Sequence, residues 1–329
     1  MDILQIKNLK TSFHTDDGTV EAVRGISYSV KEGEVVGIVG ESGCGKSVSM
    51  LSIMRLLPET ADIHADTIEC MEQNIMALSR KEMRKWQGSR IGMIFQDPMT
   101  SLNPVFTIGN QLMESLKIHK HLHGDELKRE AISLLDQVGI PDAERRLSQY
   151  PFEFSGGMRQ RVMIAIAMSC DPPLLIADEP TTALDVTIQA QILELMQDIR
   201  RQRGTSIVLI THDLGVIAGM CSRVMVMYGG LIVEEALTDE IFYQTAHPYT
   251  KGLIRSLPNS HYEGERLLPI PGAPPDLLSP PPGCPFVARC EYAMNICNEY
   301  MPEFFDISST HKVACWLHHP MAKGVAKHG

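Results

Sequence analysis

The sequence predicts an α/β fold built around a parallel sheet. Residues 34–39 form a β-branched apolar run that is followed by a glycine-rich loop and by a helical pattern over residues 47–57. Two later apolar runs, residues 174–177 and 207–210, end in polar residues and flank a helical pattern over residues 186–201. Strands that alternate with helices in this order are typical of a parallel sheet.

Three other regions show different patterns. Residues 1–35 alternate apolar and polar positions and break at Asp16-Asp17-Gly18, which predicts short antiparallel strands. Residues 107–149 are mainly helical by pattern, with a break around Gly124. Two apolar stripes support these helices, the first formed by Ile108, Leu112, Leu116 and Ile118 and the second by Ala131, Leu134, Leu135 and Val138. After about residue 254, prolines from Pro258 onward predict an extended, loop-rich segment.

Composition limits the class of protein. The chain has 329 residues, of which 44% are hydrophobic, enough for one substantial domain and a smaller second one. Its formal charge of −10 argues against a nucleic-acid partner. The longest apolar stretches, such as residues 162–168, are far shorter than the roughly 20 residues that cross a bilayer. No secretory signal is visible, so we expect a cytosolic chain that reaches a membrane only through partners.

The stretch Gly40-Glu41-Ser42-Gly43-Cys44-Gly45-Lys46-Ser47 fits the phosphate-loop pattern G-x-x-x-x-G-K-[ST]. Its glycines allow backbone N–H groups to curl around a phosphate chain, and the N-terminus of the following helix adds positive potential. We expect Lys46 to contact the β- and γ-phosphates and Ser47 to hold Mg²⁺. A chance glycine-rich turn is the alternative, but the placement of strand and helix favours phosphate binding.

An acidic pair, Asp178 and Glu179, follows the strand over residues 174–177. Ligands of open α/β sheets bind at the carboxyl ends of the strands. We expect Asp178 to support Mg²⁺ and Glu179 to polarise the attacking water. Such a pair is more often a solvated turn, and only the phosphate loop upstream favours the catalytic interpretation.

A second anion site is indicated between these motifs. Ser155, Gly156 and Gly157 form a turn that opens a helical stretch, although an ordinary helix cap is the simpler interpretation in isolation. The position of this turn between the phosphate loop and the acidic pair favours the anion site over an ordinary helix cap. From about residue 3 to residue 254, the chain resembles the nucleotide-binding subunits of ABC transporters.

The resemblance implies a domain organisation. It implies a P-loop NTPase fold with an N-terminal antiparallel β subdomain, a parallel core sheet and a helical subdomain at about residues 100–160. The ATP-binding domain would cover residues 1–254, and residues 255–329 would form a small C-terminal extension. ATP and Mg²⁺ are the implied cofactors.

The resemblance also implies roles for single residues. Gln96 is similar to the glutamine that senses Mg²⁺ and the membrane partner, and Asp185 lies in the loop 183–185 that couples two subunits. His212 is similar to the histidine that contacts the γ-phosphate, although a lone histidine is more often structural. Phe13 is similar in position to the aromatic residue that stacks on adenine, with a core phenylalanine as the alternative.

In this family two subunits enclose ATP between them. Ser155, Gly156 and Gly157 would therefore act on nucleotide held by the phosphate loop of a partner subunit, so one cassette implies a dimer. Phe154 and Met158 depart from the commonest Leu and Gln of the signature. The departure leaves the phosphate-binding Ser-Gly-Gly intact.

Three stretches resemble the dipeptide and oligopeptide importer branch: residues 96–104, 155–161 and 246–250. Nickel importers share much of this pattern. The branch implies two membrane permeases, an extracytoplasmic binding protein and a second, similar ATPase, with this chain at the cytoplasmic face of the membrane. A non-transport ABC ATPase acting on DNA or ribosomes is the alternative class, but the two cassettes, long inserts or basic surfaces usual there are not apparent in the sequence.

Four of the eight cysteines lie near the end of the chain, at Cys284, Cys290, Cys297 and Cys315. Four thiolates suit an iron-sulfur cluster or tetrahedral zinc, and the closely spaced pairs usual for zinc are missing. Resemblance to dipeptide importers with this tail implies a 4Fe-4S cluster. Zinc and unliganded thiols are alternatives, as is a tail that senses redox state or metal and regulates the ATPase. Three nearby histidines keep mixed ligation open, although exposed tail side chains are the simpler interpretation: His311, His318 and His319.

Overall fold

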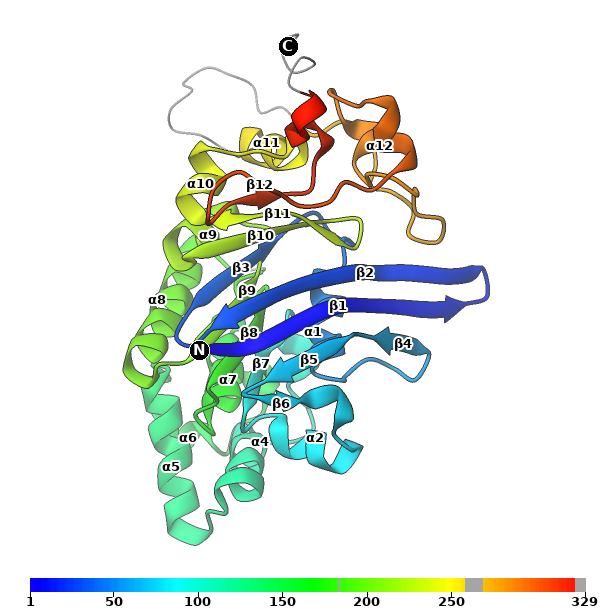
Figure 1. Ribbon diagram of the computed structural model, residues 1–329. Coiled ribbons are helices and arrows are strands. Elements are labelled where there is room, and N and C mark those ends of the chain that lie inside the picture. Colours follow the sequence, from blue (N-terminus) through cyan, green and yellow to red (C-terminus); the bar gives the residue numbers. More distant parts are fainter. Residues whose placement is uncertain (183, 258–268, 323–329) are drawn as a thin grey trace. The chain divides into compact units, whose positions relative to one another are not determined.

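The computed structural model describes residues 1–182, 184–257 and 269–322 (Figure 1). The described residues group into two compact units, each assembled from separate stretches of the sequence. Unit 1 comprises residues 1–3, 30–35 and 71–210, without residue 183. Unit 2 comprises residues 4–29, 36–70 and the described residues from 211 onward. Two positions named in the sequence predictions, Ala183 and Pro258, lie outside the described residues.

A parallel sheet forms the centre of unit 1. Its strands are β7 (Ile91–Ile94), β8 (Leu174–Asp178) and β9 (Ser206–Ile210), in the order β9-β8-β7. All of their residues are buried, as expected for strands covered on both faces. The predicted parallel pairing is confirmed, with Ala177 opposite both Ile94 and Leu209. The carboxyl end of β8 therefore delivers Asp178 at one edge of the sheet.

Helices make up most of the rest of unit 1. They are α2 (Arg80–Trp86), α3 (Pro98–Ser101), α4 (Ile108–Ser115), α5 (Gly124–Gln137), α6 (Ala143–Arg146), α7 (Gly156–Met168) and α8 (Val186–Arg203). Shorter elements are β6 (Gln73–Asn74), the 3₁₀ turns η1 (Ile75–Ala77) and η3 (Pro151–Glu153), and the π-helical turn η2 (Leu116–Lys120). The two predicted stripes lie on α4, η2 and α5.

The prediction of a buried stripe is wrong for one residue of the first stripe. Ile108, Leu112 and Leu116 are fully buried, whereas Ile118 is 57% exposed. The helix widens to a π turn at Leu116, which rotates the following side chains away from the face that a regular 3.6-residue period predicts. The second stripe is buried in full, over Ala131, Leu134, Leu135 and Val138.

Unit 2 contains an antiparallel sheet. Two long strands, β1 (Asp2–Thr15) and β2 (Gly18–Lys31), lie side by side (Figure 1) and are joined by a turn at Asp16-Asp17. β4 (Ala61–His64) and β5 (Thr67–Cys70) both pair with β1 in antiparallel register. The predicted antiparallel pairing and the break between the strands are confirmed, but the predicted short length is wrong, because β1 and β2 have 14 residues each.

A second group of strands in unit 2 carries the phosphate loop. Its order is β12-β13-β11-β10-β3, formed by β12 (Phe305–Asp306), β13 (Lys312–Val313), β11 (Leu231–Leu237), β10 (Arg223–Tyr228) and β3 (Val35–Val39). β10 is parallel to β3, and the remaining neighbours are antiparallel. The segment predicted as loop-rich thus adds two short strands to this sheet.

The helices of unit 2 are short. They are α1 (Lys46–Ile53), α9 (Leu214–Met220), α10 (Thr238–Tyr243), α11 (Pro248–Arg255), α12 (Asn295–Glu299) and the 3₁₀ turns η4 (Val287–Arg289), η5 (Trp316–His318) and η6 (Pro320–Ala322). α1 ends earlier than the predicted residue 57, because Arg55 takes a left-handed φ of 52°. The predicted boundary between residues 254 and 255 falls at the end of α11 and stays a prediction. Across the part of the chain that the structure describes, no helix is both long and apolar enough to cross a membrane.

Candidate nucleotide site

The phosphate loop begins where β3 ends and leads into α1. Two of its glycines have no room for a side chain. A Cβ at Gly40 would lie 2.2 Å from the Met227 carbonyl oxygen, and a Cβ at Gly45 would lie 2.3 Å from that of Ala22. Gly45 also has φ of 99°, which L side chains rarely adopt. Neighbouring strands therefore fix the path of the loop, which is the geometry that a phosphate-binding loop needs.

Lys46 places a buried positive charge in this loop. Its ammonium donates hydrogen bonds to the carbonyl oxygens of Gly40 (2.8 Å) and Glu41 (2.9 Å). The side chain is nearly fully buried, whereas Ser42 and Gly43 at the tip of the loop are exposed. Ser47 is half-buried in the first turn of α1. The buried ammonium and the exposed tip suit a ligand that brings negative charge to the loop.

The acidic pair has a defined geometry in unit 1. Asp178 is the buried last residue of β8. Glu179 has φ of 46°, a strained value for a residue with a side chain, and its N–H donates to the carbonyl oxygen of Ile210 at 2.8 Å. Gln96 donates to the Glu179 carboxylate at 3.0 Å, and the Thr182 hydroxyl donates to the same oxygen at 2.7 Å. Two donors thus hold the carboxylate that the sequence assigns as the base.

The Ser-Gly-Gly turn opens α7, a helix of 13 residues. The Ser155 hydroxyl accepts a hydrogen bond from the Met158 N–H at 3.4 Å, so this residue is an N-cap as well as a candidate phosphate ligand. Ser155 and Gly156 are exposed, and a Cβ on Gly157 would lie 2.8 Å from Cγ2 of Ile188. The N-terminus of α7 therefore presents an uncovered backbone to a ligand.

Asp185 lies beside this turn. It caps α8, because its carboxylate accepts from the N–H of Ile188 at 3.0 Å. The Ile188 side chain also lies where a Cβ on Gly157 would point, so one residue neighbours both the predicted coupling residue and the predicted signature.

Similarity to known proteins agrees with this geometry. Residues 23–182 match the family model described as ABC transporter, and residues 233–297 match that of the oligopeptide/dipeptide transporter C-terminal region. The dipeptide transport ATP-binding protein DppD of Bacillus subtilis is 53% identical over 331 residues, which cover 99% of each chain. The chain belongs to the ABC transporter family. Another relative, the oligopeptide transport ATP-binding protein OppD of Escherichia coli, is 49% identical over 91% of this chain and 89% of its own length.

Solved structures of ABC cassettes share the fold. The dimeric post-hydrolysis state of the cassette MJ0796, bound to ADP and Pi, has a TM-score of 0.65 at 27% identity and covers 71% of this chain and 98% of its own. CbiO1 of Clostridium perfringens has a TM-score of 0.60 at 29% identity, over 74% and 92% of the two chains. The predicted fold class is confirmed. As an ABC transporter subunit, this chain hydrolyses ATP and works with membrane-spanning permease components.

The remaining predicted nucleotide residues of this ABC ATPase lie in unit 2, together with the phosphate loop. His212 is exposed and follows Thr211, whose N–H donates to the carbonyl oxygen of Ile38 at 3.3 Å. The hydrogen bond of Thr211 therefore places His212 next to β3, the strand that leads into the phosphate loop. Phe13 is half-buried on β1, opposite Ala61, rather than fully enclosed in a core. Both roles stay predictions.

Two polar contacts of the site were missed by the sequence analysis. The Thr182 hydroxyl donates to the Glu179 carboxylate. Its position three residues after Glu179 was the only feature of the sequence that could have predicted this contact. The hydroxyl of Tyr249 accepts a hydrogen bond at 2.8 Å from the N–H of Glu41, inside the phosphate loop. From the sequence, residues 246–250 indicate only the importer branch. No sequence pattern shows that Tyr249 contacts the phosphate loop, which lies some 200 residues earlier in the chain.

The four C-terminal cysteines of the ABC ATPase line one small cavity of about 10 Å³. The amide of Cys284 donates to the carbonyl oxygen of Cys297 at 2.8 Å, which joins two of the four segments. Burial raises the pKa of Cys284 and of Cys315 to about 12, so these thiols are protonated at neutral pH unless a cation binds them. Within the described residues, no group of three or more His, Cys, Asp or Glu side chains has the geometry to hold a metal ion.

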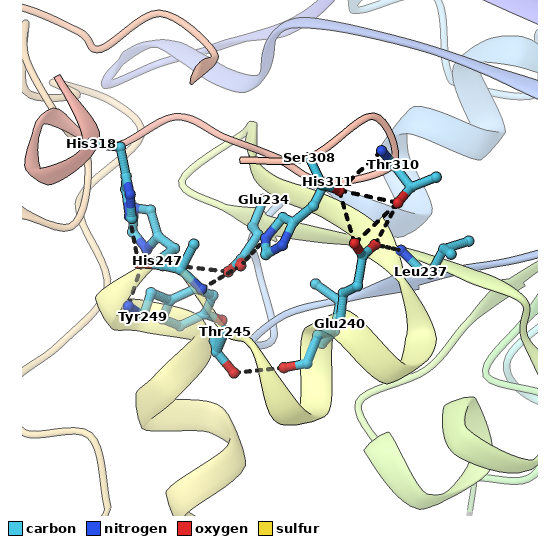
Figure 2. A network of polar contacts seen from close by, with 12 residues as sticks. Glu234, Leu237, Glu240, Thr245, His247, Tyr249, Ser308, Thr310, His311 and His318 are labelled. Carbon is cyan, nitrogen blue, oxygen red and sulfur yellow. Dashed lines mark hydrogen bonds and ion pairs between the residues drawn. The ribbon is translucent and has the colours of Figure 1, made fainter. Parts of the chain in front are cut away.

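The nearby histidines have other partners. His311 is buried, so the expectation of an exposed tail residue is wrong for it, and its Nε2 lies 2.8 Å from a Glu234 carboxylate oxygen (Figure 2). His318 Nε2 lies 3.1 Å from the carbonyl oxygen of Ala246. The pairing of His311 holds the C-terminal segment onto β11.

Proposed function

We propose that this ABC ATPase drives the import of dipeptides or oligopeptides. Similarity over nearly the whole chain to ATP-binding proteins of dipeptide and oligopeptide transport supports the substrate class. The single observation that carries the proposal is the match of residues 233–297 to the C-terminal region of such transporters, because a cassette alone carries no information about the solute.

Glu179 acts as the base in the proposed mechanism. The donors Gln96 and Thr182 orient its carboxylate, and the strained backbone at Glu179 aims the side chain from the end of β8. A carboxylate held in this way polarises the water that attacks the γ-phosphate. The resemblance to ABC ATPases is the support for the proposed contact of His212 with the γ-phosphate.

The phosphate loop and Mg²⁺ bind the rest of the nucleotide. Backbone N–H groups of residues 40–45 and the ammonium of Lys46 contact the phosphates, and Phe13 stacks on adenine. The resemblance supports Ser47, Gln96 and Asp178 as proposed Mg²⁺ ligands, and a hydroxyl, an amide oxygen and a carboxylate are hard oxygen ligands of the kind that this ion takes. Bound there, Mg²⁺ would neutralise charge on the β- and γ-phosphates.

A second ATPase subunit completes each site. The exposed N-terminus of α7, with Ser155, Gly156 and Gly157, contacts nucleotide held by the partner, and Asp185 couples the two subunits. We propose that the partner is a similar but different ATPase. Two permeases and an extracytoplasmic binding protein complete the transporter, with this chain at the cytoplasmic face of the membrane.

Uptake by the reconstituted transporter tests the substrate class. The chain is assembled in vesicles with its permeases, its binding protein and the second ATPase, and labelled dipeptide, labelled oligopeptide and Ni²⁺ are offered in parallel. We expect peptide uptake that requires ATP, with a non-hydrolysable ATP analogue as the control. Uptake of Ni²⁺ without uptake of peptide would replace the proposal by the nickel alternative, and co-purification with nucleic acid instead of permeases would favour a non-transport ATPase.

A 4Fe-4S cluster is our proposal for the cysteine cavity. The ligand set supports it, because Cys284, Cys290, Cys297 and Cys315 line one cavity and four thiolates are the usual ligands of such a cluster. The closely spaced cysteine pairs that are usual for zinc are missing from this segment, which disfavours zinc. A bound cluster would supply a redox-active centre or a structural crosslink.

Spectroscopy of anaerobically purified protein tests the cluster. We expect a broad visible absorbance band and about four iron atoms per chain, and Cys290→Ser should remove both. Cys170→Ser, which changes a cysteine outside the cavity, is the control and should leave the band intact. A colourless protein that contains zinc would contradict the proposal.

A further inference from the structure

Arg289 binds a residue of the phosphate loop. Its Nη1 donates to Oε2 of Glu41 at 2.7 Å and its Nη2 donates to Oε1 at 3.0 Å, which is the bidentate geometry of the strongest ion pairs. The Arg289 side chain is only 5% exposed and that of Glu41 is 25% exposed, so water screens the pair far less than it screens a surface pair.

The guanidinium is held in place by further acceptors. Nη1 also donates to the Tyr228 hydroxyl at 3.0 Å, Nη2 to the carbonyl oxygen of Ile270 at 3.1 Å, and Nε to that of Pro271 at 2.8 Å. The fork is therefore oriented by the C-terminal extension and by β10 before it meets Glu41. Pre-orientation of this kind lowers the entropy cost of the contact.

Glu41 adds a negative charge to a loop that binds polyphosphate. Its carboxylate follows Gly40 directly, and a negative charge near the phosphates disfavours nucleotide by Coulomb repulsion. Arg289 neutralises this charge. The Glu41 carboxylate is paired with Arg289, whereas the Lys46 ammonium is bound to the loop carbonyls of Gly40 and Glu41.

Tyr249 fixes the backbone of the same residue. Its hydroxyl accepts the hydrogen bond from the Glu41 N–H, and its ring packs against that of Tyr228 with centroids 4.4 Å apart. Figure 2 shows how Tyr249 is placed: its N–H donates to Nδ1 of His247 at 3.0 Å, and the His247 N–H donates to Glu234 at 3.0 Å. Glu234 in turn pairs with His311 of the C-terminal segment.

We propose that Arg289 is a positioning residue for nucleotide binding, which neutralises Glu41 and, together with Tyr249, holds the first turn of the phosphate loop. The C-terminal extension then sets the affinity of the ABC ATPase for ATP. Arg289 immediately precedes Cys290, so the same short turn carries both the contact to the loop and one wall of the cysteine cavity. The inference rests on the proposed role of residues 40–47 as the ATP phosphate site.

Nucleotide titration of paired variants tests this role. The dissociation constant of a fluorescent ATP analogue with Mg²⁺ is measured for the full chain and for Arg289→Gln, with Arg255→Gln as the control. Arg255 lies in the same extension but forms an exposed pair with Glu291 at 3.5 Å. We expect Arg289→Gln to weaken binding about tenfold and to raise KM more than it lowers kcat, because an uncompensated charge remains in the loop. Arg255→Gln should match the parent.

A double variant separates charge from folding. Glu41→Gln in the Arg289→Gln background removes the uncompensated charge, and it should restore affinity to within about threefold of the parent. If Arg289→Gln is insoluble, Arg289→Lys takes its place in the series and should weaken binding by about threefold, because lysine keeps the charge but not the fork.

Two results would overturn the proposal: equal affinity for Arg289→Gln and Arg255→Gln, or a double variant as weak as Arg289→Gln alone. Binding of nucleotide by the parent chain is the reference throughout. A parent chain that binds no ATP would contradict the proposed function itself, so the two failures are distinguishable.

Discussion

The buried charge of Glu234 is held by several hydrogen bonds. Glu234 is fully buried and accepts from the N–H groups of Ala246 at 2.7 Å and His247 at 3.0 Å as well as contacting His311. Burial alone raises the pKa of Glu234, but the bonds from His311 and the two backbone N–H groups outweigh it, so its pKa lies below the usual value of 4.5. The carboxylate therefore stabilises the fold only while it is ionised.

The Glu234 contact predicts an acid-sensitive attachment of the C-terminal segment. A carboxyl with a lowered pKa in the folded state contributes stability that is present above about pH 4.5 and is lost as pH falls below it. Glu234→Gln should lower stability by about 2–3 kcal/mol at pH 7, because it leaves donors unmatched. Thermal unfolding at pH 7, 5, 4 and 3.5 should show this difference shrinking below about pH 4.5. The exposed Glu303→Gln is the control, and a difference that does not change with pH would contradict the account.

The sequence predicts individual site residues where they belong to a recognisable motif. It does not predict which other side chains these residues contact. Lys46, Asp178 and Glu179 follow from local patterns. The bond from Gln96 to Glu179 depends on the pairing of β7 with β8, and that of Arg289 to Glu41 joins residues 248 positions apart. Such contacts depend on the tertiary fold, which no local period encodes.

At the scale of elements, long and regular segments were predicted best. The strands β3, β8 and β9 carry continuous apolar runs, and the stripe on α5 is buried as expected. The π turn η2 was missed, because it breaks the helical period inside a continuous pattern. The strands β12 and β13 have two residues each, too few to show alternation, and they form only because β11 offers an edge with which to pair.

At the scale of the whole molecule, the motifs of the ABC ATPase are divided between two units. The phosphate loop, His212 and the C-terminal cysteines belong to unit 2, whereas Gln96, Glu179 and the Ser-Gly-Gly turn belong to unit 1. The sequence pattern places the motifs in order along the chain, but it does not show that each unit is assembled from separate stretches, because this division depends on the pairing of distant strands.

The central claim is that Glu179 is the base for ATP hydrolysis. The ATPase activity of the Glu179→Gln variant tests this claim most directly. The amide keeps the shape of the side chain and can still accept from Gln96, but it cannot serve as a base. We expect ATP to bind as in the parent while kcat falls at least about 100-fold. The exposed Glu194→Gln on α8 should hydrolyse ATP at the parent rate. Undiminished hydrolysis by Glu179→Gln would contradict the assignment.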